Sequence, residues 1–215
     1  GVRIYIGPNF LVREKLFVPL DTPGAIITYT VESRKPVDIV VHFVPVLDLM
    51  WPAAIGGQDT GWDSASSGYV MTEQTHRFSA VIGSTDIVAH DEIFKSAESS
   101  STPNGFAFTV RAGGAAGNKT STVVVASGDE TLKDSPVTNT RALVAELTHS
   151  SARMEQDAIA HYASLRSNSV QIETPNATLN KDLTWAEIAL DQAWVCNPYL
   201  GCGLVAGYGP SRGAR

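Results

Sequence analysis

Apolar and polar residues alternate in many short stretches over the first 135 residues, as in half-buried β-strands. The stretches are rich in Val, Ile, Thr, Phe and Tyr, and Gly, Pro, Asn and Asp separate them. The predicted strands are Val2–Ile6, Lys15–Val18, Ala25–Ser33, Val37–Val46, Tyr69–Thr75, Phe78–Gly83, Ile87–Ile93, Phe106–Ala112 and Thr120–Ser127. Short strands without intervening helices favour a mainly β fold, an antiparallel β-sandwich.

After residue 135 the pattern changes to that of amphipathic helices. Residues Arg141–Arg166 carry apolar side chains at helical spacing, namely Leu143, Leu147, Met154, Ala158, Tyr162 and Leu165. A second helix is predicted over Thr178–Val195, with one stripe formed by Leu179, Leu183, Ala186, Leu190 and Trp194. We therefore expect a β-sandwich domain at 1–135, a linker helix at 136–168 and the start of another domain at 169–215.

Composition and charge narrow the classes of partner. The chain has 215 residues, of which 43% are hydrophobic and 18% charged, in the range of a folded soluble protein. Its net charge is −6, and Lys and Arg are scattered along it, which argues against nucleic acid or an anionic membrane as a partner. No apolar run approaches the ~20 residues that span a bilayer. The compartment stays open between cytoplasm and periplasm.

Cysteine and histidine spacing indicates no metal or other cofactor. Cys196 and Cys202 lie in a Gly-rich run without a nearby histidine, so a zinc site is not expected. Two buried thiols are expected from the general burial of cysteine, and a local disulfide closing a short loop is the alternative. The five histidines lie apart, and the cluster His90-Asp91-Glu92 is interpreted as an exposed strand end.

The segment Trp51–Glu73 is predicted to be a long loop with two tryptophans and two aspartates among several glycines. Exposed Trp51 or Trp62 would stack on a sugar ring, with Asp59 or Asp63 accepting hydrogen bonds from its hydroxyls. The alternative is a Gly-rich hairpin whose tryptophans close the end of the sandwich or pack on a neighbouring domain. The sequence contains no Gly-x-Ser-x-Gly nucleophile elbow, no phosphate-binding loop and no Cys/His nucleophile arrangement.

The last residues, 197–215, read NPYLGCGLVAGYGPSRGAR. Glycines permit close backbone approach, and tyrosine and arginine offer flat surfaces and donor forks for a polar, ring-shaped ligand. The run is therefore predicted to form one wall of a binding site. Both ends of the chain are abrupt, and we expect it to be a piece of a longer polypeptide.

This run, with the preceding Leu183–Ala186 and Ser169–Asn176 (SVQIETPN), resembles bacterial glycogen-debranching-like glycoside hydrolases related to amylo-α-1,6-glucosidase. The resemblance is specific over Ser169–Arg215 and only architectural over the first 135 residues. It implies an N-terminal β-sandwich of the supersandwich kind, linker helices, and then an (α/α)6 barrel that is truncated here after its first helix.

The resemblance further implies an inverting glycosidase for α-glucosidic or related linkages, in which two barrel carboxylates act as acid and base. These carboxylates follow residue 215, so no catalytic residue is assigned in this chain and it is expected to be inactive alone. Sugar contacts are implied for Tyr208, Ser211 and Arg212. The implied partners are an oligo- or polysaccharide and the barrel domain. The alternatives are a carbohydrate-binding module using Trp51 and Trp62, or a non-catalytic structural or interaction sandwich.

Overall fold

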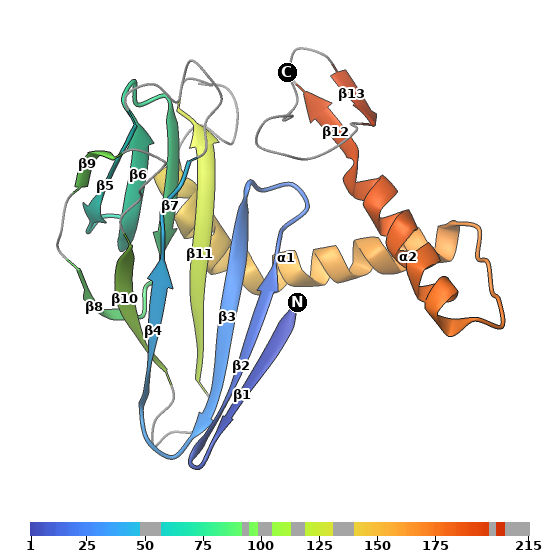
Figure 1. Ribbon diagram of the computed structural model, residues 1–215, viewed down its shortest axis with the longest axis horizontal. Helices are drawn as coiled ribbons and strands as arrows, with labels where there is room; N and C mark the ends of the chain where they lie inside the picture. Colours follow the sequence, from blue (N-terminus) through green and yellow to red (C-terminus); the bar gives the residue numbers. More distant parts are fainter. Residues whose placement is uncertain are drawn as a thin grey trace. The chain divides into compact units, whose positions relative to one another are not determined.

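The computed structural model describes residues 1–47, 57–91, 95–98, 105–112, 119–130, 140–197 and 201–204. The described residues form a mainly β structure with antiparallel sheets and two helices (Figure 1). The chain divides into two compact units, Gly1–Glu155 and Gln156–Arg215, and each is considered by itself. The prediction of a mainly β, antiparallel fold followed by helices is confirmed.

The larger sheet of the first unit has eight strands, all paired antiparallel. In spatial order they are β1 (Val2–Gly7), β2 (Phe10–Phe17), β3 (Gly24–Ser33), β11 (Lys119–Asp129), β7 (Phe78–Gly83), β6 (Gly68–Glu73), β5 (Gln58–Asp63) and β9 (Lys95–Glu98). The central strand β11 joins the N-terminal strands β1–β3 to the hairpins that follow them in sequence.

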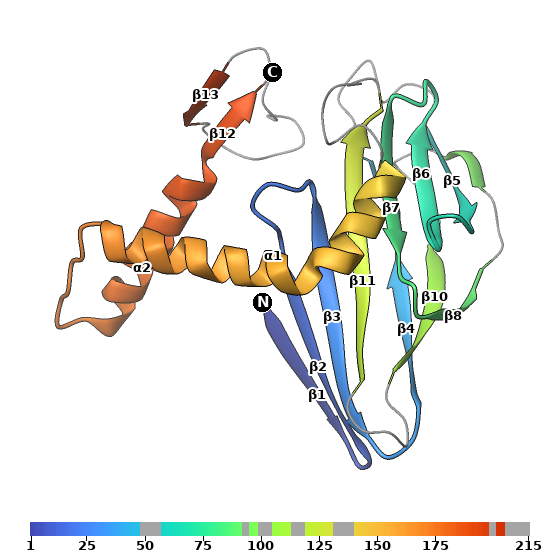
Figure 2. The ribbon, with the colours of Figure 1, turned by 180° about the vertical axis from the view of Figure 1, so that it is seen from behind.

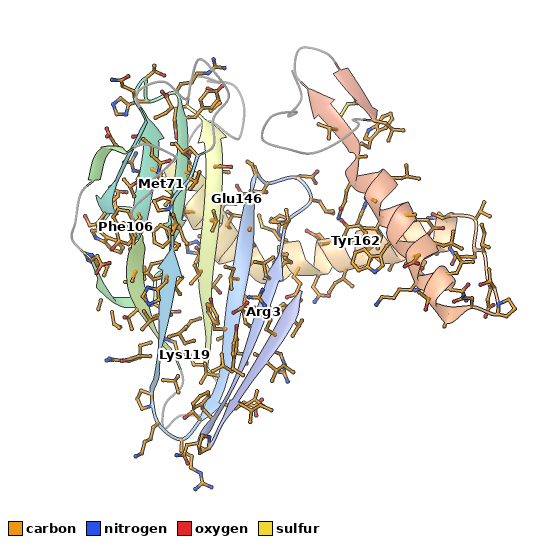
Figure 3. All side chains as sticks on the ribbon, viewed as in Figure 1. Arg3, Met71, Phe106, Lys119, Glu146 and Tyr162 are labelled. Atoms are coloured by element: carbon orange, nitrogen blue, oxygen red, sulfur yellow. A yellow bond between two sulfur atoms is a disulfide. The ribbon has the colours of Figure 1, made fainter. Side chains whose placement is uncertain are left out.

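A second sheet of three strands packs against the inner face of the first. It consists of β4 (Val37–Phe43), β10 (Phe106–Ala112) and β8 (Ile87–His90), in that order. Alternate residues of β10, Phe106, Phe108 and Val110, are buried in the core between the sheets, as the period of a strand requires. Met71 of β6 belongs to the same core (Figure 3). The unit is thus a sandwich of two antiparallel sheets.

The outer face of the large sheet is covered by the first half of α1 (Thr140–Asn168), as Figure 2 shows. Leu143 and Leu147 of the helix pack with Ile26, Val81 and Val124 of the strands in a second core. At Gly24 a Cβ would lie 2.4 Å from the carbonyl oxygen of Val125 and 2.6 Å from Cδ1 of Leu147, so this close approach requires glycine.

The second unit contains the rest of α1, the helix α2 (Ala177–Gln192) and the hairpin of β12 (Trp194–Asn197) and β13 (Gly201–Leu204). Asn176 caps α2, because its side chain accepts hydrogen bonds from the backbone N–H groups of Thr178 and Leu179 at 3.0 and 3.2 Å. Polar contacts join the two helices. His161 Nε2 lies 2.7 Å from Asp191 Oδ2, and Gln192 donates to the Tyr162 hydroxyl at 3.1 Å.

Most predicted elements match, and the differences have local causes. The strands Phe78–Gly83 and Phe106–Ala112 have the predicted bounds, and α1 extends the predicted first helix by one or two residues at each end. The predicted long loop at Trp51–Glu73 contains the β5–β6 hairpin instead, as its alternative interpretation expected. The second helix ends at Gln192, so Trp194 begins a strand rather than extending the helical stripe.

The expectation of two buried thiols is wrong, because Cys196 and Cys202 form a disulfide. The early end of α2 places them in the β12–β13 hairpin, where they are directly opposed in the strand register. Both residues are exposed. The alternative prediction, a local disulfide closing a short loop, is confirmed.

The packing of α1 on the sheet gives a direct test. Leu147 is 0% exposed, so Leu147→Ala should lower the free energy of unfolding by about 2–5 kcal/mol through lost burial and a residual cavity. The matched control is Leu190→Ala on α2, where the leucine is 62% exposed and the expected loss is below about 1 kcal/mol. Urea unfolding followed by circular dichroism measures both. Equal losses would contradict the assignment of the second core.

Candidate functional site

Of the residues predicted to contact sugar, Asp59, Trp62 and Asp63 lie within the described part of the chain, all three on β5. Trp51, Tyr208, Ser211 and Arg212 lie outside the described residues. The surroundings of Trp62 are therefore the part of the predicted site whose geometry the structure shows. Trp62 is on β5, next to Tyr69 of β6 in the strand register.

Trp62 lies in an aromatic cluster with Tyr69 and His90, here called the Trp62 cluster. The indole and the His90 imidazole are stacked, with centroids 3.7 Å apart and planes inclined by 9°. Tyr69 meets Trp62 edge-on, with centroids 5.3 Å apart and an interplanar angle of 79°. The edge-on contact of Tyr69 is a favoured geometry for an aromatic pair, and the His90 ring lies directly over the face of the indole. One face of the indole is thus occupied by the protein itself, and the role of Trp62 in sugar stacking stays a prediction.

The Tyr69 hydroxyl connects this cluster to the backbone by hydrogen bonds. It lies 2.5 Å from the carbonyl oxygen of Asp91 and 3.2 Å from that of Ala107, and Tyr69 is fully buried. Burial, with the charge of Asp91 as a second cause, raises the pKa of Tyr69 to about 12. The phenol therefore stays protonated at neutral pH, and it serves as a hydrogen-bond donor rather than an acid or base.

Asp91 and Asp63 are the carboxylates beside the cluster, and both have structural hydrogen bonds. Asp91 Oδ2 accepts from the backbone N–H of Ala107 at 2.9 Å. Asp63 Oδ2 accepts from the Ser66 hydroxyl at 2.6 Å and from Nε of Arg141, on α1, at 3.0 Å. Burial alone would raise the pKa of Asp63, but these hydrogen bonds hold the pKa below its usual range. Asp63 thus remains ionised and ties the β5–β6 hairpin to the start of α1.

The His90 contact was missed by reasoning from the sequence. The sequence predicts an exposed strand end at His90-Asp91-Glu92, and His90 is indeed the last residue of β8. Its ring is half-buried, however, because β8 brings it against Trp62 of the other sheet. The sequence shows a histidine at the end of a predicted strand and a tryptophan without a predicted contact. Predicting that the two are in contact requires the order of the strands in the sheets.

A second polar group lies at the start of α1 and involves Glu130, Ser79 and Thr140. Glu130 Oε1 accepts hydrogen bonds from the hydroxyls of Ser79 and Thr140, the latter at 2.7 Å, and from the backbone N–H of Thr140 at 3.3 Å. Burial alone would raise the pKa of Glu130, but the hydrogen bonds and the charge of Arg141 lower it. The carboxylate thus accepts hydrogen bonds from the N–H and hydroxyl of the first residue of the helix, where negative charge is favourable.

Glu73 has a similar role in the turn after β6. Its carboxylate is buried and accepts from the N–H and hydroxyl of Thr75, both at 2.6 Å, and from the N–H groups of Arg77 and Phe78 at 2.5 and 3.2 Å. Burial alone would raise the pKa of Glu73, but these donors lower it. The donors around Glu73 and Glu130 come from the β6–β7 turn and from Ser79 and the start of α1, so both carboxylates have a structural role.

Comparisons with known proteins assign no family. No protein-family model matches the chain, and no curated protein matches it. Among the described residues, no three His, Cys, Asp or Glu side chains are grouped so that they would hold a metal ion. Neither helix, over its described length, is long and apolar enough to cross a bilayer.

Removal of the Tyr69 hydroxyl from the Trp62 cluster should have a measurable effect on the stability of the protein. Tyr69→Phe removes the buried hydroxyl and leaves the Asp91 and Ala107 carbonyl oxygens without this donor, so stability should fall by about 1–3 kcal/mol. Tyr5→Phe is the control, because the Tyr5 hydroxyl donates to Glu14 at the surface. Its expected loss is below about 1 kcal/mol. Thermal unfolding measures both, and an unchanged Tyr69→Phe variant would contradict the assigned role.

Glu130 predicts a pH-dependent difference. Its folded-state pKa is lowered, so its stabilisation is fully present above the unfolded value of about 4.3 and is lost as the pH falls through the folded-state pKa. At pH 7, Glu130→Gln should lower the free energy of unfolding by about 1–3 kcal/mol. The gap between wild type and variant should close below about pH 4.

Urea unfolding at several pH values measures this gap. Glu146→Gln, at an exposed position of α1, is the control and should cost less than about 0.5 kcal/mol at pH 7. A gap for Glu130→Gln that stays constant from pH 7 to acid would refute the assigned role of the charge.

Proposed function

We propose that the chain is the N-terminal β-sandwich and linker of a glycogen-debranching-like glycoside hydrolase, bracing an (α/α)6 catalytic barrel and lining one side of its substrate cleft. The proposal rests on the resemblance over Ser169–Arg215, and the order of a sandwich followed by helices agrees with it. In this proposal residues 169–215 begin the barrel, and α2 is its first helix.

The observation that carries the proposal is the uncovered apolar surface of α2. No residue of α2 is buried, and Leu179, Trp185 and Leu190 are all exposed. Trp194 and Leu204 of the following hairpin are exposed too. Exposed apolar surface of this kind marks an interaction site. A helix of an (α/α)6 barrel has neighbours on more than one side, which would cover these side chains.

The side of α2 that contacts α1 is not the side that carries its apolar stripe. Asp191 and Gln192 contact α1 through polar groups, whereas the stripe of Leu179, Leu183 and Leu190 is left uncovered or only partly covered. Amphipathic helices usually turn their apolar stripe toward the neighbour that they pack against. The uncovered stripe thus supports a further helical neighbour for α2.

The proposal assigns roles beyond the described residues. Tyr208, Ser211 and Arg212 would contact the sugar, and the acid and base would be carboxylates of barrel segments after residue 215. Inverting hydrolysis needs two carboxyl groups about 6.5–9.5 Å apart across the bond. Glu73 and Glu130 are committed to internal donors, so the 215-residue chain is proposed to bind or brace and not to hydrolyse.

The test is to sequence the gene beyond codon 215 and to assay the full protein on α-1,6-branched gluco-oligosaccharides. We expect further codons for paired helices containing acidic residues, release of glucose with inverted anomeric configuration seen by NMR, and no release by the 215-residue chain. A stop codon soon after codon 215, or hydrolysis with retention, would refute the proposal.

The same assay series addresses the alternative of a carbohydrate-binding module. The 215-residue chain is titrated with malto-oligosaccharides to millimolar concentration, with Trp62→Ala as the variant and Trp185→Ala as the control. We expect no binding that depends on Trp62, because His90 already occupies one face of its ring. Binding that Trp62→Ala removes and Trp185→Ala retains would favour the module instead.

A further inference from the structure

Strand β1 has an open outer edge. It is the terminal strand of the eight-stranded sheet, and in the described part of the chain it pairs with β2 alone (Figure 1). The register with β2 runs from Val2↔Lys15 to Gly7↔Phe10 without a bulge. Proteins usually protect such edges with prolines, bulges or inward charges. Strand β1 has no proline and no bulge, and its one charged residue, Arg3, is paired with Glu14 of β2.

The ladder shows which backbone groups of β1 face outward. Gly1 and Leu16 exchange two hydrogen bonds, at 2.7 and 2.8 Å. Bonded and non-bonded pairs alternate in an antiparallel ladder, so Arg3 and Tyr5 are bonded to β2 as well. The N–H and C=O groups of Val2, Ile4 and Ile6 therefore point away from β2 and are available to another strand.

The same three residues carry an apolar stripe. Val2, Ile4 and Ile6 lie on one face of β1, and the side chain of each is more than half exposed. Arg3, the charged residue of β1, is on the opposite face with Tyr5, and both contact Glu14, at 3.3 and 3.0 Å. The positions with open hydrogen-bonding groups thus carry apolar side chains and no charge.

We propose that β1 pairs antiparallel with β1 of a second copy of this chain, with Ile4 on the twofold axis. In this register Ile4 faces Ile4 of the second copy, and Val2 faces Ile6. Each of these pairs exchanges two hydrogen bonds, because these residues present the outward groups. The sheet then continues through both copies, and the two apolar stripes join into one.

The occupant is a second copy because the strand is complementary to itself. A shift of one residue would place open groups against groups already bonded to β2, and would set the apolar residues of one copy opposite Arg3 and Tyr5 of the other. In the proposed register Arg3 faces Tyr5 of the second copy, where a guanidinium has a favourable aromatic partner. A twofold contact of this kind is the common form of homodimer.

This dimer is independent of the proposed glycosidase role and of residues after 215. One added strand pair buries less surface than a standard interface, so association should be weak and depend on concentration. It is measured by sedimentation of the 215-residue chain between about 1 μM and 1 mM. Ile4→Lys places two like charges opposite each other on the axis and should weaken the dimer by about tenfold or more.

The matched control is Ile159→Lys. Ile159 lies on α1 and is 54% exposed, against 55% for Ile4, so the exchange is the same in chemistry and exposure. It should leave the dimer unchanged. A monomer throughout the concentration range, or a dimer that Ile4→Lys leaves intact, overturns the proposal. Equal weakening by both variants overturns it as well.

Amide hydrogen exchange and cross-linking test the register. The Ile4 and Ile6 amides should be protected only at dimeric concentrations, whereas those of Arg3 and Tyr5 should be protected at all concentrations. Protection of Ile4 and Ile6 in the monomer would show another occupant of the edge and refute the pairing. Ile4→Cys should give a disulfide-linked dimer on mild oxidation, since bonded pairs have Cα atoms about 5.5 Å apart. Ile159→Cys should not.

Discussion

The central strands of the large sheet, β3, β11 and β7, are buried on both faces, and the architecture of the first unit depends on this constraint. In β11, Val123 belongs to the core between the sheets, and its neighbours Val124 and Ala126 belong to the core under α1. A strand with apolar residues on both faces needs a layer on each side. The three-stranded sheet supplies one layer and the first half of α1 supplies the other, with glycine at position 24 allowing the helix to approach closely.

Buried or half-buried carboxylates accept hydrogen bonds at the places where these layers begin and turn. Glu73 satisfies the donors of the β6–β7 turn, and Glu130 satisfies the start of α1. Asp63 adds a link from the β5–β6 hairpin to Arg141 in the first turn of the helix. Each ion is compensated by several donors, as burial of a charge requires. Asp63, Glu73 and Glu130 thus account for the local geometry at these places.

Much of this fold could be predicted from the sequence, because most strands have apolar residues where their inward faces need them. Strand β5 could not, since its buried inward positions are Gln58 and Thr60. Gln58 is satisfied by Pro45 and Leu47, contacts that depend on tertiary structure, and the Thr60 hydroxyl has no partner among the described residues. The Cys196–Cys202 disulfide was predicted only as the alternative to two buried thiols, because the general burial of cysteine says nothing of the strand register that sets these two residues opposite each other. The sequence singles out Trp62 as a candidate for stacking on a sugar. Its contact with His90 could not be predicted, because it depends on the order of the strands in the two sheets.

The apolar run of β11 also has a consequence for how the chain folds. Both neighbours of β11 in the sheet, β3 and β7, precede it in the sequence, and α1 follows it. During synthesis the docking places for this strand are therefore made before the strand itself, whereas the layer that covers its outer face emerges afterwards. Segments rich in valine are prone to intermolecular β pairing while they are exposed. The short sequence separation between β11 and α1 thus limits the time for which the nascent chain presents this valine-rich strand uncovered.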